Sequence, residues 1–92
     1  MDFTTIKRHF LSAVCALGTM EGTIGERLRT VYREHLRQIE ANPSLPDSLR
    51  DDYDKLMSEL SGLLSRQGDI DSRRAAAVAK RIVSLYDRMI KA

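Results

Sequence analysis

Apolar residues recur every three to four positions along most of the chain, which is the period of one face of an α-helix. Glycine, proline and polar residues separate four such stretches. No stretch alternates apolar and polar residues as a half-buried strand does, and no internal repeat is visible. The spacing predicts helices over residues 3–18, 24–41, 45–66 and 72–91.

Two of the predicted helix starts carry the same local signal. Thr23 is followed three residues later by Glu26, the spacing of a capping box, in which each side chain bonds the other residue's backbone amide. Ser44 and Asp47 repeat this spacing, with Pro46 in the first turn, where its missing N–H does no harm. We therefore expect the second and third helices to begin at these two points.

Four amphipathic segments with short connections predict one all-α domain over residues 1–92, a small up-down four-helix bundle. The helices must pack together, because none can bury its apolar stripe alone. The apolar arc of the fourth helix is wide, and Ala75 and Ala79 allow a neighbour to approach closely, in this chain or in a second copy. A homodimer is compatible with this arc, although the sequence does not require one.

Three glycines, Gly18, Gly22 and Gly25, lie close together between the first two helices and raise the question of a phosphate-binding loop. A Walker loop follows a strand and ends in Gly-Lys-Ser/Thr, whereas here a helix precedes and Glu26 follows the last glycine. The dinucleotide motif needs its glycines spaced differently. The sequence favours a helix–helix joint, in which the glycines end the first helix or let two helices approach closely.

Residue types that often carry catalysis are scarce. Cys15 lies beside the apolar stripe of the first helix and is expected to be a small buried thiol. His35 falls inside the apolar arc of the second helix, where a core or boundary role is expected. No set of three or four metal ligands is visible, and Asp51, Asp52 and Asp54 fan out around a helix instead of converging. We expect no enzyme, no catalytic residue, no metal and no cofactor.

The net charge of +2 is distributed unevenly along the chain. Residues 71–92 carry six basic against two acidic side chains, so the basic character belongs to the fourth helix. Three of its arginines recur every seven residues, and the other bases follow a neighbouring line. We predict a partner-binding face made of Arg73, Arg74, Lys80, Arg81, Arg88 and Lys91.

Three interpretations of this basic face stay open: it pairs with the acids of the third helix, binds an acidic protein surface, or contacts nucleic-acid phosphates. Nucleic acid is the less favoured partner, since Tyr86 lies on the apolar side and no helix carries a set of base-reading residues. The leading hypothesis is a non-enzymatic protein–protein interaction module, an adaptor, regulator or accessory subunit. It would use this basic face or a groove beside the first helix.

Three stretches of the chain resemble a group of short, all-helical bacterial proteins with Arg-Leu-x-x-x-Tyr, Leu-Pro-x-x-Leu-Arg and Leu-Tyr-Asp motifs. The matching residues are Arg27, Leu28 and Tyr32, then Leu45, Pro46, Leu49 and Arg50, then Leu85, Tyr86 and Asp87. The resemblance implies a bacterial origin and a compact helical domain. It carries over no activity and no site.

A single cysteine fits a reducing compartment, since it cannot form an internal disulfide. No apolar run approaches the roughly 20 residues that a bilayer-spanning helix needs, and the first ten residues are too polar for a secretory signal. The sequence predicts a cytoplasmic protein that does not associate with membranes.

Overall fold

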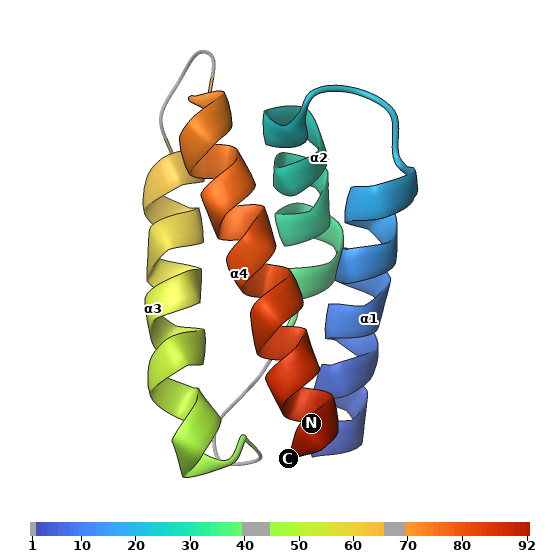
Figure 1. Ribbon diagram of the computed structural model, residues 1–92, viewed down its shortest axis with the longest axis vertical. Coiled ribbons are helices and arrows are strands. Elements are labelled where there is room, and N and C mark those ends of the chain that lie inside the picture. The colour runs from blue at the N-terminus through green and yellow to red at the C-terminus, as the bar shows by residue number, and fades with distance from the viewer. Residues whose placement is uncertain (1, 40–44, 66–69) are drawn as a thin grey trace.

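The computed structural model describes residues 2–39, 45–65 and 70–92. Along the chain follow α1 (Phe3–Thr19), α2 (Ile24–Val31), a π-helical turn η1 (Tyr32–Leu36) that continues α2, then α3 (Asp47–Leu64) and α4 (Ser72–Lys91). Successive helices run in opposite directions (Figure 1). The predicted all-α four-helix bundle is confirmed, and the described ranges contain no strand.

α4 is the central helix of the bundle. It packs along α1, α2 and α3, whereas α2 and α3 have little direct contact with each other. In Figure 1, α4 runs in front, between α3 on one side and α1 and α2 on the other. A helix in this position needs a wide apolar arc, which explains why the fourth helix has one.

The core is a single cluster of apolar side chains from all four helices. α1 contributes Ile6, Phe10, Ala13 and Leu17, α2 and η1 contribute Leu28, Val31 and Leu36, α3 contributes Leu49, Tyr53, Leu56, Leu60 and Leu63, and α4 contributes Ala75, Val78, Ala79, Ile82, Leu85 and Met89. No polar or charged side chain of the described residues is buried among them. The apolar periodicity therefore places the core correctly.

The buried ring of Tyr53 packs in a tilted arrangement on Phe10, with ring centroids 6.3 Å apart. Burial, together with the nearby Asp54 and Tyr32, raises the pKa of Tyr53 from 10.0 to about 12, with burial the largest cause. The phenol is thus held in its neutral form.

The second helix differs from its predicted range of 24–41. Regular α-helix ends at Val31, the π turn ends at Leu36, and Arg37 and Gln38 form a turn; residues 40 and 41 lie outside the described ranges. The amide of Arg37 donates to the carbonyl of Tyr32 at 2.8 Å, five residues back. The π turn lets both Val31 and Leu36 reach the core, because a π turn contains more residues than an α turn and so brings residues five apart to the same side of the helix.

The third helix begins two residues later than predicted. Its N-cap is Pro46, which offers only its backbone carbonyl, to the amides of Leu49 at 2.9 Å and Arg50 at 3.1 Å. Leu45 is buried before the helix, and its carbonyl accepts a bond from Arg50 Nη2 at 3.0 Å. The predicted cap at Ser44 and the predicted end at residue 66 lie outside the described residues.

The glycine-rich joint folds as a capped turn between α1 and α2. Thr23 Oγ1 accepts from the amide of Glu26 at 3.1 Å, which confirms the N-cap half of the predicted box. Gly22 has a φ of 104°, the left-handed region that favours glycine. A side chain at Gly25 would have its Cβ 3.1 Å from Ile70, so this glycine allows a close approach, whereas Gly18 lies inside α1 and does not end it.

Arg27, near the start of α2, stabilises this joint. Its Nη1 donates to the carbonyl of Leu17 at 2.7 Å. That carbonyl belongs to the last turn of α1, where carbonyls have no partner within the helix. Arg27 therefore satisfies the end of α1 from the next helix and ties the two together.

No helix in the described ranges is both long enough and apolar enough to cross a lipid bilayer.

Candidate functional site

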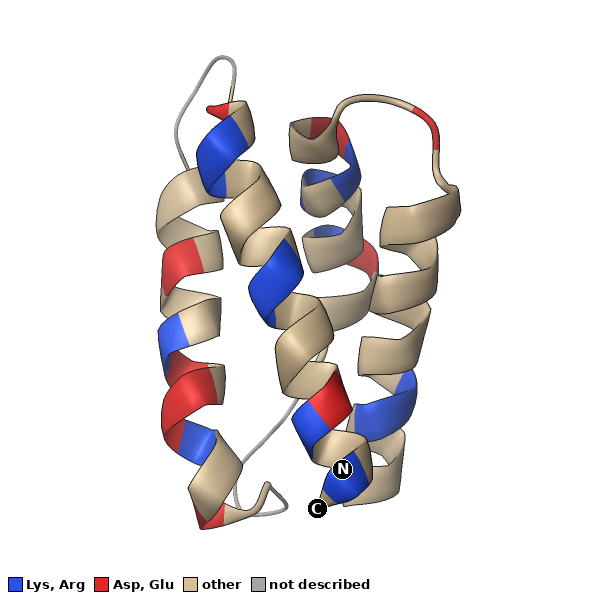
Figure 2. Ribbon diagram, in the orientation of Figure 1, with Lys and Arg blue, Asp and Glu red and all other residues tan. Residues whose placement is uncertain are grey.

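α4 carries the predicted basic face along its whole length. Asp71 caps the helix by accepting from the amide of Arg73 at 2.9 Å, and the apolar stripe fixes which side faces the core. An α-helix turns by about 100° per residue, so positions seven apart return to nearly the same side. Figure 2 shows basic segments recurring along α4, with acidic segments on the neighbouring α3.

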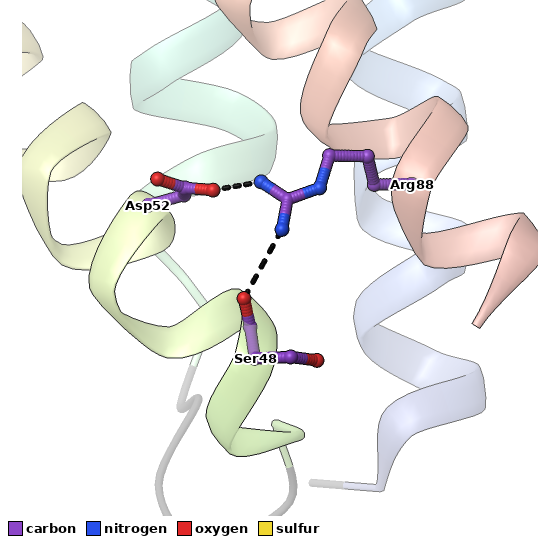
Figure 3. A network of polar contacts seen from close by, with 3 residues as sticks. All are labelled: Ser48, Asp52 and Arg88. Atoms are coloured by element: carbon purple, nitrogen blue, oxygen red, sulfur yellow. Dashed lines mark hydrogen bonds and ion pairs between the residues drawn. The ribbon is translucent and has the colours of Figure 1, made fainter.

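Two of the six predicted residues reach across to α3. Arg88 forms an ion pair with Asp52 and also donates to the carbonyl of Ser48 at 3.1 Å (Figure 3). Seven residues earlier on α4, about two helical turns, Arg81 pairs with Glu59. We call Arg81, Arg88, Asp52 and Glu59 the paired row. Its side chains are 39–51% exposed, so each pair stabilises the fold by at most about 1 kcal/mol.

The other four predicted residues do not pair with α3 among the described residues. Arg73, Arg74 and Lys80 are exposed, and Lys91 pairs within its own helix with Asp87 at 2.8 Å. The basic face is therefore two surfaces: a row that is partly neutralised by α3, and a line of bases that projects into solvent.

The solvent-facing line of α4 also carries apolar side chains, which the basic pattern does not reveal. Val83 is 45% and Ile90 is 54% exposed. With alternating steps of three and four residues, the spacing matches the contact line of a coiled coil. We call this line the outer seam; it consists of Arg73, Ala76, Lys80, Val83, Asp87 and Ile90, all exposed.

A second basic surface lies on the opposite flank of α3, where α2 and η1 stand apart from it. A groove of about 430 Å³ opens there, and we call it the arginine groove. Its lining is Arg29, Tyr32, Arg33, Arg37, Ser61, Leu64 and Ser65. The arginine spacing is visible in the sequence, but on its own it describes any solvated helix face.

The isolated cysteine and histidines do not form a site. Cys15 is exposed, so the prediction of a buried thiol is wrong. Cys15 lies two residues from both Ala13 and Leu17, which are buried, and two residues turn a helix by about 200°. His9 and His35 are half-buried, and His35 has the expected boundary position. Within the described ranges no group of three His, Cys, Asp or Glu could hold a metal ion.

Comparison of the chain with protein-family models, curated proteins and solved structures gives no match. The resemblance to short helical bacterial proteins therefore stays a prediction. The geometry of the two basic surfaces is therefore the basis for proposing a binding function.

Proposed function

We propose that this chain is a non-enzymatic helical interaction module, an adaptor, regulator or accessory subunit, that binds a protein partner through the outer seam of α4. The observation that carries the proposal is the exposure of Val83 and Ile90 beside Arg73 and Lys80. Bases alone would suit any anionic partner. Bases interleaved with aliphatic side chains suit a partner that offers both carboxylates and apolar area.

The apolar positions favour protein over nucleic acid, the alternative that the basic residues also allow. Most contacts to nucleic acid go to phosphate and sugar, which give Val83 and Ile90 little apolar surface to bury. A partner helix with apolar and acidic residues at the same spacing would bury both and pair with Lys80 and Arg73. The seam is only half apolar, which is typical of a reversible interface more than of an obligate one.

The test begins with affinity purification to identify a partner, which is then purified and titrated against the chain by calorimetry. We expect Lys80→Glu with Val83→Glu to weaken binding at least about a hundredfold, since it removes one charge pair and one apolar anchor. Leu11→Glu with Lys55→Glu is the matched control: Leu11 is also 45% exposed, and both residues are exposed on helices other than α4. The control should bind within about twofold of the unmodified chain.

Equal binding by the seam variant and the unmodified chain would refute the outer seam as the interface. Loss of binding in the control variant alone would move the interface to the exposed surface of α1 around Leu11 or of α3 around Lys55. Sedimentation of the purified chain shows whether the partner is a second copy. Retention of a labelled oligonucleotide at about 50 mM salt, lost in the seam variant, would favour the nucleic-acid alternative.

A further inference from the structure

We propose that the arginine groove between α2, η1 and α3 is a binding site for a small polyphosphorylated anion. This goes beyond the outer seam of α4, because the two surfaces lie on different helices and share no residue. The groove is lined by three guanidinium groups, two serines and a tyrosine, with Leu64 as its apolar side chain.

The π turn brings the three arginines into line. On a regular α-helix, residues four apart drift by about 40° around the axis, so Arg29, Arg33 and Arg37 would spiral away from one another. The wider turn from Tyr32 to Leu36 has more residues in it and turns less per residue, which cancels much of this drift. All three side chains line the same groove as a result. π turns inside α-helices are frequent at functional sites.

The charge in the groove is uncompensated by its own walls. None of its lining residues is acidic. The one described ion pair of these arginines is the contact of Arg33 with its chain neighbour Glu34, at 3.8 Å, and both side chains are more than half exposed. Such a pair contributes little and is readily exchanged for a ligand. The opposite wall offers the hydroxyl groups of Ser61 and Ser65, which can bond to phosphate oxygens.

The dimensions favour a ligand with more than one phosphate group. Eight residues separate Arg29 from Arg37, a rise of about 12 Å, so one phosphate cannot engage all three guanidinium groups. Arginine forks bind phosphate through two parallel hydrogen bonds, and successive phosphates of a short chain can occupy successive forks. The volume of about 430 Å³ suits a small molecule.

The experiment titrates inorganic triphosphate into the isotope-labelled chain and follows backbone amides by NMR, with calorimetry for affinity. We expect saturable shifts confined to residues 29–37 and 61–65, and binding at least about tenfold weaker for inorganic monophosphate. Arg33→Gln with Arg37→Gln should weaken triphosphate binding at least about tenfold. The matched control, Arg73→Gln with Arg74→Gln, removes the same charge from α4 and should change affinity less than twofold.

Circular dichroism checks that both variants keep their helix content, which is expected because all four side chains are exposed. Arg33→Lys with Arg37→Lys keeps the charge without the fork, and should bind more weakly than the unmodified chain. Equal weakening by the groove and α4 variants would overturn the proposal, since binding would then follow net charge. No saturable shift at millimolar triphosphate, or shifts produced by an oligonucleotide alone, would overturn it as well.

Discussion

The two flanks of α3 face arginines from different helices, and they differ in what α3 itself supplies. On the α4 side, Asp52 and Glu59 meet Arg88 and Arg81. On the α2 side, Ser61 and Ser65 lie across from Arg29, Arg33 and Arg37.

The difference shows that a row of bases on a helix does not by itself indicate binding. Where a neighbouring helix supplies carboxylates, the bases stabilise the bundle weakly; where it supplies hydroxyl groups, their charge stays available to a ligand. The paired row and the arginine groove can therefore be separated experimentally by stability on one side and by binding on the other.

The largest expected effect lies on the apolar face of α3 between the two flanks. Tyr53 keeps its proton in the folded state up to a pKa of about 12, whereas it loses it near 10.0 when unfolded. The free energy of unfolding should therefore be unaffected by this group below pH 10 and fall between pH 10 and 12, by about 2 kcal/mol. Urea unfolding at pH 7 to 12, with tyrosinate absorbance, measures this.

Tyr53→Phe is the control for that fall, because other groups also titrate at high pH. The difference in stability between the two chains should open only above pH 10, in favour of the phenylalanine variant. A constant difference across the range would contradict the assigned pKa.

A smaller effect is expected when the same charge change is made on each flank of α3 and the two changes in the free energy of unfolding are compared. Arg88→Glu places a carboxylate beside Asp52 and removes the bond to the Ser48 carbonyl, so it should lower the free energy of unfolding by about 1 kcal/mol. Arg33→Glu makes the same charge change in the groove and should alter it by less than about 0.5 kcal/mol. Urea unfolding of both variants at pH 7 measures the contrast, and equal losses would show that the flanks do not differ in this way.

The smallest effect concerns salt. Glu59→Gln removes the pairing of Arg81, with an expected loss of about 0.5 kcal/mol or less at low ionic strength. The loss should vanish near 1 M salt, where charges are screened within about 3 Å. Ser61→Ala, on the other flank, serves as the reference, and its stability relative to the unmodified chain should not depend on salt.

Periodicity is enough to predict the helices and their buried faces, because apolar spacing and burial have the same physical cause. The fourth helix matches its predicted range of 72–91, and the first ends one residue beyond its range. The second departs from prediction where the buried positions step by five, from Val31 to Leu36. Steps of three or four residues predict a regular helix through the half-buried Tyr32, which is four residues before Leu36, and so do not predict the π turn.

The surfaces depend on packing that a one-dimensional pattern does not contain. Arg81 and Arg88 differ from Arg73 and Lys80 only in which side of α4 they occupy relative to α3. The arginine groove exists because α2 and α3 both pack on α4 more than on each other. The prediction for Cys15 fails for a simpler reason: a residue next to the buried positions in sequence points to another side of the helix, and Cys15 is exposed.

The π turn has one more consequence, for the length of the chain. Without His35, Leu36 would follow Val31 by four residues and Ile39 would follow by seven, the register of an uninterrupted α-helix. The core would be spared, and the last arginine of the groove would follow the first by seven residues, which on a regular α-helix returns to nearly the same side. A single-residue deletion at this point would therefore shorten the chain and leave both the buried register and the row of arginines in place. The π turn absorbs one residue beyond what a regular helix needs to make the same contacts.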